Sequence, residues 1–289
     1  MADSAWQTAA HGQQWVAWLD SGEWERSLDT FSPMIPALAV EISRLASDPD
    51  ISAIRLTQAV SKDPILAVNV IRLANSAWSA SATSITSLND AVVRVGTRAV
   101  RQLVTAACLT AKLRNPKTYG VNARALVDHA IGTAYIAWMV ADRVEGDSDS
   151  AFLSGLLHDI GKFVILKLAN DDHPAPPTMG EGRLWTCIES RHAHVGGRAL
   201  ERWNFAPSVQ MAVAWHHEPA RAHGYLEEAA IAYAANRLAH RYGFGCEALA
   251  GDDLLDDPTF AKLGLDADFM DMLDQRVPGL FEVARKIAA

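Results

Sequence analysis

Apolar residues in this chain recur with the period of an α-helix, and strand-like alternation is nearly absent. In the segment from Asp63-Pro64 to Asn75, for example, Leu66, Val70 and Leu73 form one apolar stripe. The same period predicts further helices over 34–46, 52–61, 90–113 with an interruption at Gly96, 122–143, 149–169, 184–203, 207–217 and 225–242. Loops are expected where Ser, Thr, Pro or Gly accumulate, at 76–88, 115–116 and 170–182. The sequence therefore predicts an all-α, multi-helical fold.

Composition and charge exclude several classes of protein. The 289 residues carry a formal net charge of −8, which argues against a general nucleic-acid binder because contacts with phosphates need a basic face. The three cysteines lie far apart in no metal or redox spacing, so we expect reduced thiols. The first residues lack the basic and apolar regions of a signal peptide, and no segment approaches the ~18 apolar residues of a membrane span. We therefore expect a soluble, cytoplasmic protein with neither a membrane nor a nucleic acid as its partner.

The two ends of the chain differ from its middle. Residues 1–29 hold four tryptophans, which we interpret as a packed helical cap, with a binding platform as the alternative: Trp6, Trp15, Trp18 and Trp24. From Gly245 to Ala289 there are ten acidic and four basic residues. We interpret residues 243–289 as an acidic, helical extension that is solvated and covers the domain, with a docking surface for a basic partner as the alternative.

Histidines cluster in the middle of the sequence, where eight of the ten lie between His129 and His223. An apolar helix is expected to end at the adjacent pair His158-Asp159, with Gly161 in the left-handed capping conformation. At a helix end, an imidazole and a neighbouring carboxylate can converge on one metal ion. A carboxylate can also bridge two ions through its two oxygens. His129 precedes this pair, and further histidines follow it at His192, His194, His216 and His217.

Each histidine taken alone has a structural explanation. His129 could be a core residue with one hydrogen bond. His216-His217 could, when protonated, interact favourably with the dipole at a helix C-terminus. His192 and His194 are two apart, so at most one of them faces a given direction. Together, however, four helical segments each offer a ligand-type residue in apolar surroundings, and burying several imidazoles without partners is unfavourable. We therefore predict a shared metal site with the ligands His129, His158, Asp159, His194, His216 and His217.

This set of donors narrows the choice of metal. Several imidazoles with one carboxylate suit iron, zinc, manganese or nickel, whereas magnesium and calcium prefer oxygen ligands. We expect iron, zinc or manganese. The chain has no Gly-rich phosphate loop and no Gly-x-Ser-x-Gly elbow, so we expect no organic cofactor.

These motifs resemble the HDOD domain, an HD-related output domain of bacterial signalling proteins within the HD superfamily of metal-dependent phosphohydrolases. In the N-terminal part the resemblance is carried by residues 31–36, 60–66, 71–77 and 85–96. In the C-terminal part it is carried by residues 156–162, His194 with Gly197, 203–207 and 216–219. It covers residues 30–242 and implies an N-terminal helical lobe (30–115) packed on an HD-like helical lobe (116–242).

Two departures from the enzymes of this superfamily bear on function. The HD-GYP class, which hydrolyses a cyclic dinucleotide, has a Gly-Tyr-Pro loop, whereas this chain has Gly224-Tyr225-Leu226. HD hydrolases close their site with an aspartate on the last core helix, and the matching position here holds Asn236. A neutral amide is a weaker ligand than a carboxylate, so the resemblance implies a weakened hydrolytic centre.

The sequence is therefore compatible with two functions. The favoured one is a bacterial signal-transduction or regulatory protein that binds a protein partner in a signalling pathway, with a metal in a vestigial HD site. The alternative is a metal-dependent phosphohydrolase acting on a nucleotide or cyclic dinucleotide. In that case the metal would activate a bound water and polarise the phosphoryl oxygens, with Asp159 as a ligand. Lys162 would stabilise charge on the phosphate, although it could equally be a solvated lysine at a helix end.

Overall fold

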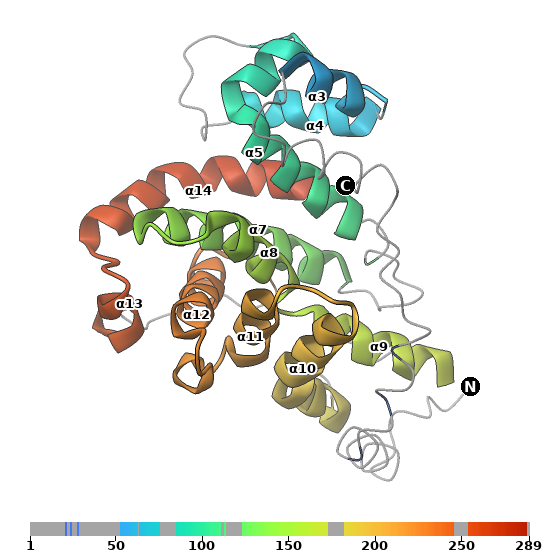
Figure 1. The fold of residues 1–289 in the computed structure, drawn as a ribbon, viewed down its shortest axis with the longest axis vertical. Helices are drawn as coiled ribbons and strands as arrows, with labels where there is room; N and C mark the ends of the chain where they lie inside the picture. The colour runs from blue at the N-terminus through green and yellow to red at the C-terminus, as the bar shows by residue number, and fades with distance from the viewer. Residues whose placement is uncertain are drawn as a thin grey trace. The chain divides into compact units, whose positions relative to one another are not determined.

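The structure is a computed structural model that describes residues 53–62, 64–75, 85–110, 123–172, 182–245 and 254–287, together with Ser21, Trp24, Leu28 and Leu113. All regular secondary structure within these ranges is helical (Figure 1), which confirms the predicted all-α fold. The helix expected over 34–46 and the tryptophans Trp6, Trp15 and Trp18 lie outside the described residues, whereas Trp24 is buried. Among the described residues, no helix has the length and apolar character needed to cross a membrane.

The described residues fall into two compact units. The smaller unit contains α3 (Ala53–Val60), α4 (Pro64–Ala74), α5 (Leu88–Thr110) and the C-terminal α14 (Ala267–Ile287). Helix α5 packs on α3 and α4, and α14 packs on α4. The interruption predicted at Gly96 is present as a kink in α5, where Gly96 has φ 81° and ψ 161°, a conformation that only glycine adopts readily.

The larger unit is built around α7 (Ala123–Arg143), whose residues from His129 to Ala137 are all buried. Helices α8 (Ser148–Leu157) and α12 (Leu226–Arg241) pack on α7. Helix α10 (Gly182–Arg202) packs between α9 (Ile160–Asp172) and α11 (Pro207–Trp215), and α11 also contacts α8 and α12. Two 3₁₀ turns, Pro219–Arg221 and Leu254–Asp256, and the short α13 (Pro258–Lys262) complete the unit. Because the middle of α7 is buried on all sides and rich in alanine, its neighbours can surround it closely.

The helix predicted over 149–169 is in fact two helices, α8 and α9, which meet at His158-Asp159. The backbone at His158 stays right-handed, with φ −54° and ψ −37°. The break has a local cause, because the His158 imidazole donates to the carbonyl of Gly155 and so competes with the backbone for the last turn of α8. The helix end expected at His158-Asp159 is therefore present, and a second helix starts directly after it.

Candidate metal centre

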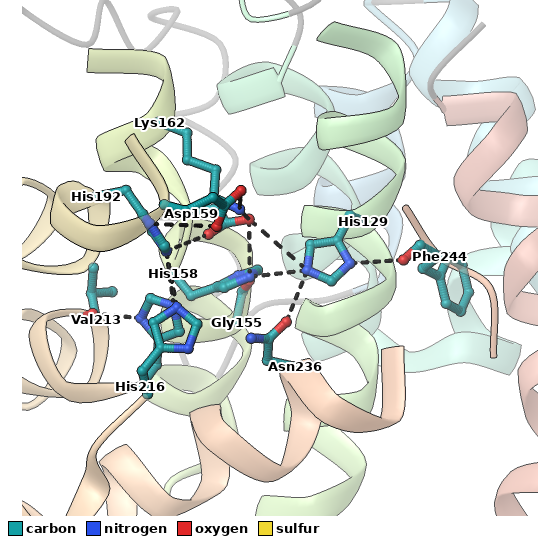
Figure 2. Close-up of polar contacts among 12 residues, drawn as sticks. His129, Gly155, His158, Asp159, Lys162, His192, Val213, His216, Asn236 and Phe244 are labelled. Atoms are coloured by element: carbon teal, nitrogen blue, oxygen red, sulfur yellow. Dashed lines mark hydrogen bonds and ion pairs between the residues drawn. The ribbon is translucent and has the colours of Figure 1, made fainter. Parts of the chain in front are cut away.

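Six helices of the larger unit, α7 to α12, bring most of the predicted ligands to one place (Figure 2). His129 lies in α7, and His158 and His216 each directly follow a helix, α8 and α11 respectively. Asp159 links α8 to α9, and α10 and α12 contribute further polar side chains. The side chains of His129, His158, Asp159 and His216 are all buried. These four side chains therefore lie inside the helical unit.

The backbone fixes the orientation of four buried imidazoles, because each places Nδ1 against a carbonyl oxygen. These pairs are His129–Phe244 (2.9 Å), His158–Gly155 (2.8 Å), His192–Ile188 (3.1 Å) and His216–Val213 (2.7 Å). A carbonyl oxygen can only accept a hydrogen bond, so each Nδ1 must carry a proton and donate it. In a neutral imidazole this leaves Nε2 with a bare lone pair.

The Nε2 atoms point toward one another. His129 Nε2 lies 3.1 Å from His158 Nε2. His192 Nε2 lies 3.3 Å from His216 Nε2 and 3.1 Å from His217 Nε2. Lone pairs at these distances repel unless a cation lies between them. Two ligand atoms each ~2.1 Å from one metal ion, at an angle of about 90–110°, are themselves about 3.0–3.4 Å apart. The observed spacing is therefore that of ligands to a common metal.

Protons do not replace that cation at neutral pH. Burial lowers the pKa of His129 from 6.5 to about 4 and the pKa of His158 to about 3. Burial also lowers the pKa of His216, and it lowers that of His217, the exposed member of the cluster, to about 4. These imidazoles are neutral at pH 7, which is the form that binds metal.

Asp159 lies between two groups of histidines, and Figure 2 shows it facing both. Its Oδ1 is 3.0 Å from His192 Nε2, whereas its Oδ2 is 3.4 Å from His158 Nε2 and 4.0 Å from His129 Nε2. Burial alone would raise the pKa of Asp159, but the charges of His158, Lys162 and His192 outweigh it and hold the pKa well below its usual value. Because His158 is neutral at pH 7, the positive charge of Lys162 contributes more than His158 does to keeping Asp159 ionised at that pH. The ionised carboxylate can offer one oxygen to each group.

Lys162 is held between two carboxylates. Its Nζ lies 3.1 Å from Asp159 Oδ2 and 3.0 Å from Glu189 Oε1. Burial alone would lower the pKa of Lys162, but these two carboxylates raise it above its usual value. On the other side of the cluster, Asn236 Oδ1 lies 3.0 Å from His129 Nε2. Asp159 is thus the one carboxylate among the groups that face the Nε2 atoms in the described residues.

Gly161 allows α9 and α10 to approach so closely that Asp159 meets His192. A Cβ atom at Gly161 would lie 1.9 Å from the carbonyl oxygen of His192 and 2.7 Å from the amide nitrogen of Gly196. The left-handed capping conformation predicted for Gly161 is wrong, since the residue lies within α9. Glycine is required here because any side chain at this position would collide with the backbone of α10.

His192, and not the predicted His194, is the histidine of α10 that enters the centre. His192 is fully buried, whereas His194 is exposed. Two residues along a helix turn the side chain by about 200°, so the two histidines face nearly opposite ways. The signal was in the sequence: His192 shares its helix face with Ile188 and Val195, which are both buried. His194 lies instead with the exposed residues Arg191 and Arg198.

The described residues thus offer two groups of donors, each with ligand atoms within 4.8 Å of one another: His129 with His158 and Asp159, and His192 with His216 and His217. We call these the His129 group and the His192 group. Because imidazole nitrogens are the main donors in both groups, a transition metal such as iron, zinc or manganese fits them better than magnesium or calcium. The role of these residues as ligands stays a prediction.

Comparisons with known proteins point to one family. The sequence model of the HDOD domain matches residues 32–219. A solved HDOD domain protein of unknown function from Geobacter sulfurreducens shares 20% identity and a TM-score of 0.67, and the match covers 91% of this chain and 97% of that one. A solved protein from Shewanella amazonensis SB2B, provisionally named a metal-dependent phosphohydrolase, has the same identity and TM-score over 97% of this chain and 100% of its own. At this identity both structures demonstrate a shared fold.

A shorter match relates the chain to a curated enzyme. Ribonuclease Y of Opitutus terrae is 36% identical over 110 residues. These residues are 38% of this chain, and the chain spans only 17% of the length of that relative.

We predict that Gly161→Ala disrupts the centre. The new Cβ must push α9 from α10, which separates Asp159 from His192 and destabilises the unit by overpacking, by roughly 1–3 kcal/mol. Elemental analysis and urea denaturation measure the two effects. The control is Gly96→Ala in the smaller unit, where the positive φ adds strain far from the centre in sequence. Retention of full metal content by Gly161→Ala would contradict the prediction.

We predict that the metal-free protein loses stability as the pH falls. Unfolded histidines take up protons near pH 6.5, but buried His129 and His158 do so only near pH 4 and 3. Between these values the unfolded state binds more protons, so the free energy of unfolding decreases as the pH falls from about 6.5 towards 4. Urea denaturation of chelator-treated protein at several pH values tests this. His158→Gln should weaken the dependence and exposed His194→Gln should not; a flat profile in the native protein would refute it.

Proposed function

The chain belongs to the HDOD domain family, and from this premise we propose that it is a bacterial regulatory protein that acts through binding, with a transition metal held by its histidine cluster. One observation carries the proposal. Four buried imidazoles have Nδ1 committed to backbone carbonyls, and their Nε2 atoms converge in two pairs at 3.1 Å and 3.3 Å. A cation is the group that turns this repulsive arrangement into a favourable one.

In this proposal Asp159 bridges two metal positions. His129 and His158 would hold one ion, and His192, His216 and His217 would hold the other. The preferred metals are iron, zinc and manganese, because imidazole dominates the donor set. The exposure of His217 leaves the His192 group the more accessible of the two to a ligand from solvent.

The distribution of charge favours binding over catalysis. Two divalent ions bring about four positive charges, and Asp159 is the one carboxylate that faces the described ligands. Asn236 supplies a neutral oxygen at the position where the hydrolases that this chain resembles have an aspartate. Lys162, the cation that would receive a substrate phosphate, is already engaged by Asp159 and Glu189.

We further propose that the output is contact with a protein partner of a cytoplasmic signalling pathway. The family is that of signalling output domains, and the acidic residues after 245 would suit a basic partner surface. We propose that the chain is organised as a cap over residues 1–29, the HDOD domain over 30–242 and an acidic extension over 243–289.

A second candidate is a metal-dependent phosphohydrolase acting on a nucleotide or cyclic dinucleotide. It is favoured by the completeness of the histidines and by the short match to ribonuclease Y. A bound metal would supply Lewis-acid activation of a phosphoryl group. Lys162 could then leave Glu189 and hold a phosphate oxygen.

We predict that protein purified without chelator contains a transition metal in amounts comparable with the protein itself. Asp159→Ala should lose most of it, because both groups share this carboxylate, and His192→Gln should lose the ion of its own group. The control is His194→Gln, two residues away on the same helix, which should keep its full metal content. Elemental analysis of the four proteins is the measurement. Metal content that is unchanged in Asp159→Ala would show that the ion binds elsewhere.

We also predict no appreciable hydrolysis of cyclic dinucleotides or simple phosphomonoesters by protein loaded with manganese, iron or zinc. Asn236→Asp should tighten metal binding more than it raises any rate, because it adds negative charge without freeing Lys162. Nucleotide or phosphate release is the assay. Metal-dependent turnover on the order of 1 per second, typical of enzymes, that is lost in Asp159→Ala would establish the phosphohydrolase instead.

A further inference from the structure

One of the four carbonyls that orient the imidazoles differs from the others. His158, His192 and His216 each donate to a carbonyl three or four residues earlier, so their orientation is set within their own segment. His129 donates to the carbonyl of Phe244, which is 115 residues away. Helix α7 alone therefore does not orient His129.

The Phe244 carbonyl is held in place by its own side chain. The ring is 1% exposed and lies directly over Gly132, one turn beyond His129 on the same face of α7. A Cβ atom at Gly132 would lie only 2.3 Å from Cγ of that ring. The Phe244 amide donates to the carbonyl of Ala239 at 2.9 Å, which ties the turn to the end of α12. The Phe244 ring thus holds the turn after α12, and with it the Phe244 carbonyl, against α7.

Two other residues of the same helix face reach His129. Asn236 and His240 lie four residues apart on one face of α12, and Phe244 follows in the turn after the helix, where Gly243 has φ 76°. Asn236 Oδ1 lies 3.0 Å from His129 Nε2, and the His240 ring centre lies 4.5 Å from that of His129. Figure 2 shows His129 between Asn236 and Phe244. The imidazole is therefore enclosed by a segment remote in sequence.

We propose that Phe244 is a positioning residue, and that metal binding by the His129 group requires the turn 242–245 to be docked on α7. The His192 group has no such requirement, because its orienting carbonyls are local. This inference rests on the proposed metal centre. It makes the two metal positions unequal, and it places control of the His129 group at the end of α12. Loss of an orienting hydrogen bond typically weakens metal binding by about 10–100-fold.

The test is metal titration of chelator-treated protein with Zn²⁺, resolved into two classes of site. Phe244→Ala should weaken one class by about 10–100-fold and leave the other unchanged. Adding His192→Gln to the Phe244→Ala protein should remove the remaining class of metal site. Phe244→Leu keeps an apolar anchor and should recover most of the affinity.

Two variants separate positioning from general stability. Phe260→Ala removes an equally buried phenylalanine from α13 and should leave both classes of site unchanged. Gly132→Ala should imitate Phe244→Ala by displacing the ring, although alanine is the better helix former in α7. Equal loss in Phe244→Ala and Phe260→Ala, or no loss in Gly132→Ala, would overturn the proposal.

A readout without metal keeps this inference distinct from the proposed function. In ¹⁵N-histidine-labelled, metal-free protein, His129 should be a single Nδ1-protonated tautomer, and Phe244→Ala should populate both tautomers. If wild-type protein binds no metal, the proposed function fails, yet this spectrum still tests the role of Phe244. An unchanged His129 spectrum in Phe244→Ala would refute that role.

Discussion

Four buried imidazoles, each with Nδ1 hydrogen-bonded to a backbone carbonyl, are the constraint on which the larger unit depends. A neutral imidazole has one donor and one acceptor, and a backbone carbonyl takes the donor in every case. All the acceptors must then be accommodated in one interior space. Two buried lone pairs at 3.1 Å are unfavourable without a cation, so the metal-free fold carries this repulsion in its core. Binding a metal would therefore stabilise the fold as well as create a site.

The sequence predicted the helices well because helical period and helix-breaking residues are local signals. The kink at Gly96 followed from such a signal. The convergence of His129, His158-Asp159 and His216-His217 was inferred instead from the clustering of ligand-type residues and from the resemblance to the family. The choice between His192 and His194 depended on which face of α10 is buried. That face was readable from Ile188 and Val195, but the resemblance to the family drew attention to the wrong residue.

Features that depend on long-range contacts were not predictable from the sequence. The requirement for Gly161 arises from the carbonyl of His192 on another helix. The link between Phe244 and His129 joins positions 115 residues apart, neither of which carries a recognisable motif for the other. Patterns along one helix contain no information on which carbonyl a distant turn will present.

The charged groups around the centre also form one connected system. Lys162 neutralises Asp159 and is itself shared with Glu189, so any ion that binds Asp159 must compete with an ammonium group 3.1 Å away. Displacing Lys162 from Asp159 would leave it to Glu189, which lies on α10 one turn before His192. Metal binding would then strengthen the contact between α9 and α10 on the solvent side of the centre. The same exchange that admits the metal would keep Lys162 engaged with Glu189 and away from a phosphate, which supports the proposed binding function over catalysis.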